Sequence, residues 1–515
     1  MSAFLSAKQR SKGGTTVDVS RPMAQGISKP KTHSIIQPGR NAWRSVSCDR
    51  AAFLIDGADY YQRLEQVLQK ARRTILIVGW DFNPDIRLTP TEPDSPTLGE
   101  ILRARVDACQ ELTVHILVWA MGPVYSGKSL KLFQKAGWND HPRIRLEFDF
   151  HHPLRASHHQ KMVCVDEAVA FLGGIDLTAR RWDDRRHALP NPLRCSPDGT
   201  CYGPVHDLQS IISGDAARLV GDACRIRWKR ATSEVLDPSH DDTDDLWPAD
   251  LEPALRDCPA ALALTEPLFW NGRHGRRDAI QMTHDALRAA KRHIYLESQY
   301  LASFSIARTI IDRLREPDGP EIVILVTQES HGFLEKLMMG NNRTRLIRRM
   351  KRQDRHGRLR VYFAVTRDET GKEREIIVHS KLVVIDDRFI RVGSSNLNNR
   401  SEGLDTEADL AFEPVTEEGR RAVLALRHDL MAEHLDATPA EIARSMAETG
   451  SLIRTIDRFN YKPRGLRNFA VDVLNGETDS LVGTSIVDPR RPFWPLRQLK
   501  VGTRWALSRL TRSFS

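Results

Sequence analysis

The chain has 515 residues, of which 40% are hydrophobic and 28% are charged, and its formal net charge is +9. This length can hold two lobes with sizeable cores, and no stretch approaches the roughly 18 apolar residues of a membrane-spanning helix. Seven cysteines, an odd number without metal-ligand spacing, suggest neither a disulfide framework nor a metal site, and so favour a reducing compartment.

Residues 1–37 are predicted to be a flexible basic segment. The first 50 residues hold nine Lys and Arg against two Asp and Glu, with many Ser, Gly and Pro. The opening MSAFLSAKQRSKGG lacks a hydrophobic core and is a poor signal peptide.

Residues 38–232 are predicted to form a first α/β lobe. The helical pattern DYYQRLEQVLQKARR precedes a series of short apolar runs whose length and β-branched content are typical of buried strands. These runs are TILIVGWDF (74–82), LTVHILVWA (112–120), RIRLEFDF (143–150) and AVAFLGGIDL (168–177).

An acidic linker is predicted at 233–262, and a second lobe at 263–436 repeats the order of the first. The helical pattern DAIQMTHDALRAAKR precedes the runs HIYLESQYL (293–301), EIVILVTQ (321–328), RLRVYFAV (358–365) and RFIRVGSSNL (388–397). The fold class is therefore α/β: two similar lobes, each a mixed sheet flanked by helices, related by a pseudo-two-fold axis with the active site between them.

Residues 437–488 are predicted to be a C-terminal extension, and residues 489–515 a basic amphipathic tail. The tail holds seven Lys and Arg and no acid, with leucines at roughly helical spacing. Such a helix would either lie on an anionic membrane or pack its apolar stripe on the body of the protein.

The pattern HxKxxxxD occurs twice, first at His159, Lys161 and Asp166 and again at His379, Lys381 and Asp386. A glycine-led turn follows each copy, GGID at 173–176 and GSSN at 393–396. Two copies with matching turns indicate one active site built from both halves of the chain.

The residue types of the motif suit a phosphate. Positions i and i+2 of a strand project to the same face, so each His and Lys point together. The lysine is a point charge for a phosphoryl oxygen, and the histidine can be a nucleophile or a general acid. Small residues in the turn let backbone N–H groups approach an anion.

The chain resembles the phospholipase D superfamily in its two-motif, single-chain form. The resemblance rests on the two motifs with their turns and on the segments IYLESQYL, PGRNAWR and VHDLQ. The likeness runs from about residue 38 to about residue 435 and is greatest to the eukaryotic-type enzymes and their bacterial relatives. The resemblance implies a metal-independent phosphodiesterase that forms a phosphohistidine and needs no cofactor.

The resemblance also implies residue roles. His159 would be the nucleophile and His379 the general acid and base, an order that the local sequence does not settle. Lys161 and Lys381 would hold the non-bridging phosphate oxygens, with Asn396 as a further donor and Ser394 as a weaker contact. Asp166 and Asp386 complete the motif. Their positions along the strand place their side chains on the opposite face from the His–Lys pair, so they are expected to be structural.

Supporting residues are expected around each histidine. Gly174 and Asp176 replace the Ser394 and Asn396 of the second turn, so the two halves should be unequal. Each histidine needs a partner on its other ring nitrogen. Glu407, 28 residues after His379, stands where the family places such a carboxylate and is expected to serve that histidine, and for His159 we expect Asp183 or Asp184. Three further residues are expected either to brace the site or to be structural groups with satisfied hydrogen bonds: His206, Asp207 and Glu297. His158 is expected to be structural.

The implied activity is hydrolysis of phosphatidylcholine or phosphatidylethanolamine to phosphatidic acid, with transfer to alcohols and an effector role as extensions. The alternatives are a cardiolipin-synthase-like phosphatidyltransferase and a nuclease-type phosphodiesterase, since a positive charge also suits nucleic acid. We expect a monomer that acts on phospholipid membranes, without an obligatory protein partner and not on nucleic acid. The expected location is the cytoplasm or the inner membrane surface, with non-classical secretion as the alternative.

Overall fold

The computed structural model describes residues 34–122, 137–239, 245–268, 275–328, 333–481, 484 and 488–492, with side chains from residue 340 onward in the segment that begins at 333. Most of the predicted basic N-terminal segment and the tail beyond residue 492 lie outside the described residues. So do residues 240–244 of the predicted acidic linker.

The first half of the chain carries a helix before its first predicted strand, as expected. Its elements are β1 (Arg44–Ile55), α1 (Asp56–Leu68), β2 (Thr74–Gly79), α2 (Leu98–Ala108), β3 (Thr113–Trp119), β4 (Ile144–Asp149), β5 (Met162–Val165), β6 (Val169–Gly173), β7 (Val205–His206), β8 (Leu208–Ser213) and α4 (Asp215–Thr232).

The second half repeats this order. Its elements are β9 (Leu255–Glu266), β10 (Arg276–Arg277), α5 (Asp278–Ala289), β11 (His293–Ser298), α6 (Phe304–Arg315), β12 (Glu321–Val326), α7 (Phe333–Gln353), β13 (Leu359–Arg367), β14 (Glu373–Val378), β15 (Lys381–Ile385), β16 (Phe389–Gly393), β17 (Glu407–Phe412) and α8 (Glu417–His434). The predicted extension folds as α9 (Pro439–Thr449), α10 (Leu452–Phe459) and β18 (Gly465–Asn468).

One boundary differs from the sequence-based expectation. β9 begins at Leu255, so the last residues of the stretch predicted as a linker are a strand of the sheet. The apolar run Ala260–Leu264 within this strand is buried, which outweighs the acidic composition of the residues before it.

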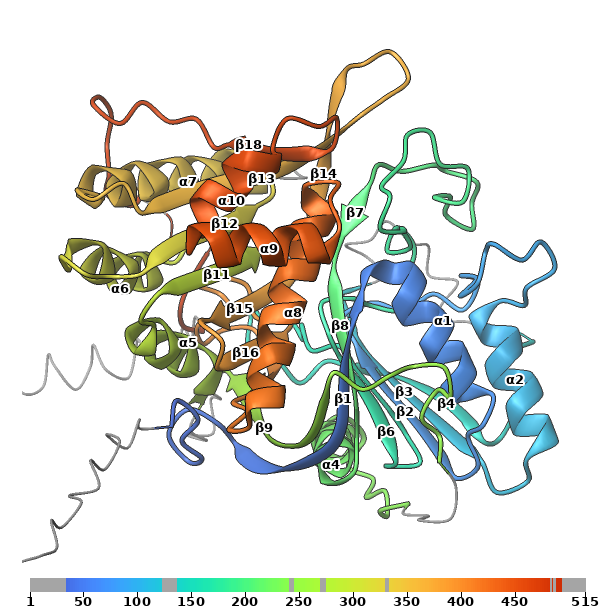
Figure 1. The fold of residues 1–515 in the computed structure, drawn as a ribbon. Helices are drawn as coiled ribbons and strands as arrows, with labels where there is room; N and C mark the ends of the chain where they lie inside the picture. Colours follow the sequence, from blue (N-terminus) through green and yellow to red (C-terminus); the bar gives the residue numbers. More distant parts are fainter. Residues whose placement is uncertain are drawn as a thin grey trace, which may run out of the picture. The chain divides into compact units, whose positions relative to one another are not determined.

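The two halves share one strand pairing scheme. β2 pairs in parallel with β3 and antiparallel with β5, and β11 does the same with β12 and β15. β6 pairs antiparallel with β8, and β16 pairs antiparallel with β17. The equivalent strands β1 and β9 pair antiparallel, as a local two-fold axis requires, and join both halves into one large mixed sheet (Figure 1). The predicted α/β fold is confirmed.

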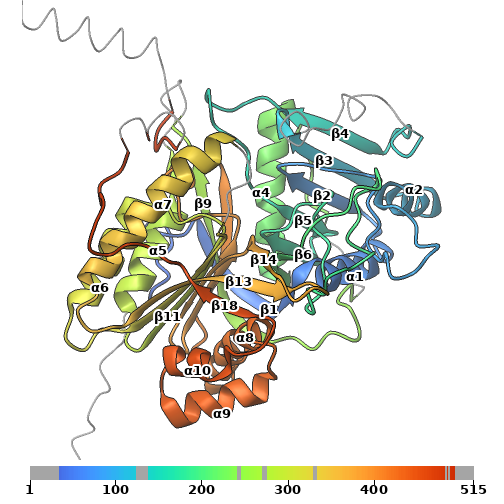
Figure 2. The ribbon, with the colours of Figure 1, turned by 90° about the horizontal axis from the view of Figure 1, so that it is seen from above.

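Helices cover both faces of this sheet (Figure 2). The core on one face runs across both halves beneath α4 and α8. The core on the other face is divided into one cluster beneath α1 and α2 and another beneath α5, α6 and α7. The junction between the halves is therefore packed from one side and bordered by two separate cores on the other.

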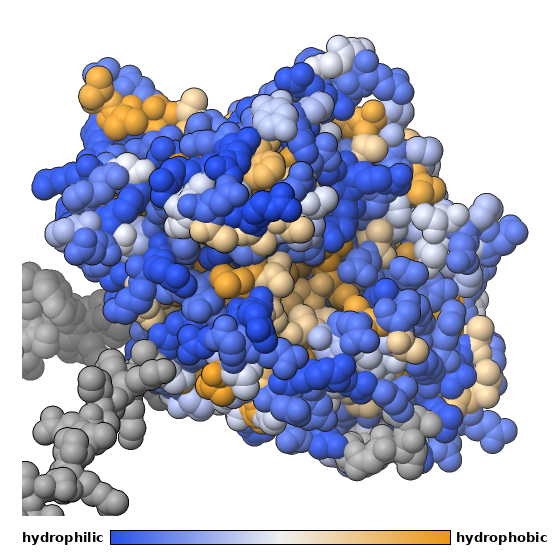
Figure 3. All heavy atoms as spheres, in the orientation of Figure 1, coloured by the Kyte–Doolittle hydropathy of each residue, from blue (hydrophilic) through white to orange (hydrophobic). Residues whose placement is uncertain are grey.

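Most of the surface seen in Figure 3 is hydrophilic, and hydrophobic residues show in a hollowed part near its middle. Among the described helices, none is both long and apolar enough to cross a membrane.

Candidate active site

Both histidine–lysine pairs stand at the start of a buried strand. His159 and Lys161 come directly before β5, and Lys381 is the first residue of β15. β5 lies between β2 and β6, and β15 lies between β11 and β16, so both strands are fixed on two sides. The two pairs therefore stand at the edge of strands that are fixed on both sides.

Backbone hydrogen bonds join each motif to the opposite half. The His159 N–H donates to the Thr406 carbonyl at 2.9 Å, and the His379 N–H donates to the His206 carbonyl at 2.7 Å. Thr406 belongs to the second half and His206 to the first. The two pairs thus meet at the junction of the halves.

The carboxylate partners of the histidines also cross this junction. Nδ1 of His159 lies 2.9 Å from Glu407 at the start of β17, and Nδ1 of His379 lies 2.6 Å from Asp207 between β7 and β8. Each carboxylate fixes the tautomer of a histidine in the other half and leaves its Nε2 for chemistry.

The prediction that Asp183 or Asp184 is the partner of His159 is therefore wrong. The Asp183 carboxylate accepts from Nδ1 of His187 at 2.9 Å and from Arg194 at 2.8 Å, and Asp184 pairs with Arg186 on the surface. Sequence proximity favoured these residues for His159 and Glu407 for His379, but the crossed arrangement makes Glu407 the partner of His159 and Asp207 the partner of His379. Asp207 stood out in the sequence without an assigned partner.

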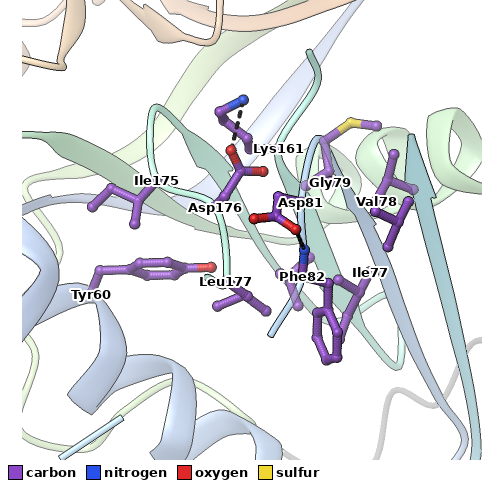
Figure 4. Close-up of a pocket in the computed structure, with 13 residues that line it drawn as sticks. Tyr60, Ile77, Val78, Gly79, Asp81, Phe82, Lys161, Ile175, Asp176 and Leu177 are labelled. Carbon is purple, nitrogen blue, oxygen red and sulfur yellow. Dashed lines mark hydrogen bonds and ion pairs between the residues drawn. The ribbon is translucent and has the colours of Figure 1, made fainter. Parts of the chain in front are cut away.

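The two lysines differ in their contacts. Lys161 Nζ lies 3.0 Å from the Asp176 carboxylate (Figure 4). It also donates to the His159 carbonyl at 2.9 Å. Lys381 Nζ donates to the His379 carbonyl and lies 3.2 Å from Nδ1 of His379. Burial lowers the pKa of Lys381 to about 7, with Asp207 opposing the change.

The histidines are neutral bases in this environment. Burial, followed by the charges of Lys161 and Lys381, holds the pKa of His159 well below its ordinary value. Burial and Lys381 do the same to the pKa of His379. A neutral imidazole is the form that can attack phosphorus.

Glu407 is held by two hydroxyls. Ser394 and Ser401 each donate to its carboxylate at 2.6 Å, while burial raises its pKa to about 7. Ser394, which was expected to touch substrate, is therefore engaged by the partner of His159. Ser401 was not among the predicted site residues, since a serine eight residues after the end of β16 carries no signal of its own.

Gly174 is explained by its neighbour across the sheet. A Cβ at this position would lie 2.1 Å from Oδ1 of Asp207, so only glycine leaves room for the carboxylate that binds His379. The second turn has Ser394 here because its hydroxyl reaches Glu407 instead. The predicted inequality of the halves lies at this position.

The last residues of the two turns also differ. Asp176 binds Lys161 and accepts from the Trp80 N–H at 2.9 Å, so it orients the lysine. Oδ1 of Asn396 is buried without a hydrogen-bond partner among the described residues. Asn396 therefore keeps an unpaired polar atom within the described part of the chain, whereas Asp176 is already paired.

The motif aspartates do not belong to the catalytic set. The Asp166 carboxylate accepts backbone N–H groups of residues 72–74 at 2.7–2.8 Å, and the Asp386 carboxylate accepts those of residues 291–293 at 2.8 Å. Both take a left-handed φ of 51° at the turn that ends their strand. They cap the starts of β2 and β11, as the structural interpretation expected.

His206 and Glu297 form a buried network behind His379. The Glu297 carboxylate lies 3.0 Å from Nε2 of His206 and accepts from the hydroxyls of Ser380 at 2.6 Å and Tyr295 at 2.7 Å. His158, on the other face of its strand, contacts Asp149 at 3.2 Å. These groups brace the site.

Comparison with known proteins agrees with this geometry. Residues 67–317 match the family described as Phospholipase D, and residues 284–417 match the family described as Cardiolipin synthase, PLD-like domain. The chain belongs to the phospholipase D superfamily.

Two curated relatives cover most of the folded region. Phospholipase D A of Dictyostelium discoideum is 24% identical over 70% of this chain and 32% of its own length. Phospholipase D2 of Bos taurus is 23% identical over 68% of this chain and 48% of its own length. The chain thus spans a third to a half of these relatives.

A solved structure shares the fold. The phosphatidylserine synthase of Haemophilus influenzae Rd KW20 has a TM-score of 0.51 and 12% identity, over 81% of this chain and 96% of that chain.

Proposed function

We propose that the chain is a phospholipase D that cleaves phosphatidylcholine or phosphatidylethanolamine to phosphatidic acid and a free headgroup. The proposal rests on one observation: each catalytic histidine contacts a carboxylate from the other half of the chain and stands beside a lysine. His159 contacts Glu407, and His379 contacts Asp207. The two long relatives are both named phospholipase D, which supports a glycerophospholipid as substrate.

The first step forms a phosphohistidine. Before the reaction His379 takes up a proton on Nε2, because the negative charge of a bound phosphodiester favours the imidazolium form. The lone pair of Nε2 on His159 attacks phosphorus, the phosphorus–oxygen bond to the headgroup breaks, and the leaving alcohol takes that proton from His379. Asp207 stabilises the His379 ring while it carries that proton. Lys161 and Lys381 neutralise the charge that develops on the non-bridging oxygens.

The second step releases phosphatidic acid. A water molecule gives a proton to Nε2 of His379 while its oxygen attacks phosphorus, and the bond to His159 breaks. A primary alcohol can take the place of water, which yields a phosphatidyl alcohol. Glu407 stabilises the charge on His159 through both steps.

A lipid surface is supported by the loop that leads to the first motif. Phe150 is 68% exposed and Leu154 is 62% exposed, between the end of β4 and His159. Large apolar side chains exposed beside an active site are suited to the interfacial region of a bilayer.

The test is lipid mass spectrometry on mixed phospholipid vesicles incubated with enzyme, EDTA and a few per cent ethanol. The proposal expects phosphatidylethanol beside phosphatidic acid, and loss of both products with His159→Ala and with His379→Ala. The exposed His356→Ala variant is the matched control and should keep full activity. Full activity of His379→Ala would refute the two-half site.

A phosphatidyltransferase is the second candidate, because residues 284–417 match the Cardiolipin synthase, PLD-like domain family. Both reactions share the first step and differ in the acceptor alcohol. A lipid alcohol consumed in preference to water and ethanol would favour transfer, and no lipid change at all would turn attention to nucleic-acid substrates.

A further inference from the structure

Four ionisable side chains meet in a fully buried cluster behind His379: Asp56, His187, His206 and Glu433. They come from separate elements, since Asp56 begins α1, His187 lies in the loop after β6, His206 is in β7 and Glu433 is in α8. One ligand atom of each lies within 4.8 Å of the other three.

The separations within this cluster are close to those around a tetrahedral ion. Nε2 of His187 lies 3.5 Å from Oδ2 of Asp56 and 3.2 Å from Glu433, and Nδ1 of His206 lies 3.1 Å from Oδ1 of Asp56 and 2.7 Å from Glu433. Zinc bonds of about 2.0–2.2 Å to nitrogen and oxygen give edges of about 3.3–3.6 Å in a tetrahedron. The contacts of His187 are close to that length, and those of His206 are shorter.

The outer contacts are those of metal-binding histidines. Nδ1 of His187 lies 2.9 Å from Asp183, and Nε2 of His206 lies 3.0 Å from Glu297. A histidine that binds a metal through one nitrogen usually donates its other N–H to a carboxylate. Both rings here have such a carboxylate on the side away from the cluster.

One ligand atom is left without a hydrogen bond. Oδ2 of Asp56 is buried and has no hydrogen-bond partner among the described residues, although it faces Nε2 of His187. A buried unsatisfied carboxylate oxygen is costly, and a cation would satisfy it.

The ligand types also suit a divalent ion. Asp56 and Glu433 offer two carboxylates to balance its charge, and His187 and His206 offer two ring nitrogens that face those carboxylates.

We propose that Asp56, His187, His206 and Glu433 bind one zinc ion in a closed structural site. Two nitrogen and two carboxylate ligands favour zinc over calcium or magnesium, which prefer oxygen ligands. The overlapping group His206, Glu297 and His434 offers only three ligands, so we assign the ion to the four-ligand cluster.

The ion would fix the segment that positions His379. The His206 carbonyl accepts the His379 N–H, and the next residue, Asp207, binds Nδ1 of His379. The zinc takes no part in the chemistry, so the proposal is independent of the substrate. A closed and buried site would also keep its ion in the EDTA of the lipid assay.

The sequence did not point to a metal site. Its cysteines lack ligand spacing, and the four ligands are spread from residue 56 to residue 433 without a local pattern. Only the packing of α1, β7 and α8 brings them together.

The test is the metal content of the full chain, produced in zinc-supplemented medium, dialysed against EDTA and measured by plasma mass spectrometry. We expect one zinc per chain, and an anomalous scattering peak at the zinc edge between the four ligand atoms. The variants His187→Gln and Glu433→Gln should lose the ion. His284→Gln, a half-buried histidine of α5 bonded to Thr309, is the control and should keep it.

The proposal is overturned if the folded unmodified chain holds only traces of zinc after refolding with excess zinc. The cluster would then be a network of buried ion pairs. It is equally overturned if the anomalous peak lies elsewhere or if both variants keep the ion. Where the variants fail to fold, the metal content and peak position of the unmodified chain decide.

Discussion

Gly174 shows how a single residue can set the geometry of a catalytic histidine. We predict that Gly174→Ala lowers kcat at least about tenfold, because its Cβ would displace the Asp207 carboxylate from Nδ1 of His379. The same change at Gly340 of α7, where a Cβ meets nothing within 4 Å, is the control in the lipid assay. Equal activities of the two variants would contradict this role.

The charged carboxylate of Glu407 lowers the stability of the fold but serves catalysis. Its pKa is raised to about 7 in the folded protein, so its contribution to stability is full below its ordinary pKa of 4.5 and is lost as the pH rises to about 7. The loss is about 3 kcal/mol. We predict that Glu407→Gln lowers kcat about 10²–10⁴-fold yet melts at a higher temperature than the unmodified chain at pH 8.

The advantage of Glu407→Gln in melting temperature should shrink at pH 4.5, where the native carboxyl is itself protonated. Melting curves followed by circular dichroism at both pH values measure this. An unmodified chain that is the more stable of the two at pH 8 would show that the charged Glu407 stabilises the fold.

The sequence predicted the reacting pairs but not their partners. His159, Lys161, His379 and Lys381 were readable because the repeated motif places them on strands. The carboxylate partner of each histidine could not be predicted in this way. Asp207 and Glu407 contact their histidines across the junction of the halves, and the local spacing of residues gives no information about such contacts. Ser394 was misassigned for the same reason, because its role depends on where Glu407 lies.

The motif aspartates act at the scale of the strand. The Asp166 carboxylate binds three successive N–H groups where β2 begins, so it ties the end of β5 to β2. We predict that Asp166→Ala costs about 2–4 kcal/mol of stability while the folded fraction keeps its kcat. Asp166→Asn, which tolerates the left-handed backbone, should cost less. Urea unfolding measures the stability, and a large fall in kcat would return Asp166 to the catalytic set.

The loop between β4 and β5 is the element most suited to meet a membrane. We predict that Phe150→Ser with Leu154→Ser reduces activity on vesicles several-fold but leaves activity on a soluble short-chain phospholipid unchanged. The exposed Val415→Ser, before α8, is the matched control. Equal losses on both substrates would mean that the loop acts on catalysis rather than on binding to the bilayer.

Strands and helices were the part of the fold that the sequence predicted well. Apolar runs such as 74–82 and 293–301 became β2 and β11 because they are buried on both faces. β1 and β9, which join the halves, were missed, since β1 carries charged residues and β9 follows an acidic stretch. Their place at the centre of the sheet depends on pairing with each other.

The whole molecule works as one unit because its two halves exchange catalytic partners. The first half supplies His159 and the Asp207 that serves His379, while the second supplies His379 and the Glu407 that serves His159. Membrane association, monomeric state and location stay predictions.

The most direct test is peptide mass spectrometry of the enzyme caught during turnover of a short-chain phosphatidylcholine and quenched in alkali, where phosphohistidine survives. The account predicts a phosphatidyl group on the peptide that carries His159, absent in His159→Ala. Steady turnover without a histidine adduct, or an adduct on His379 alone, would contradict it.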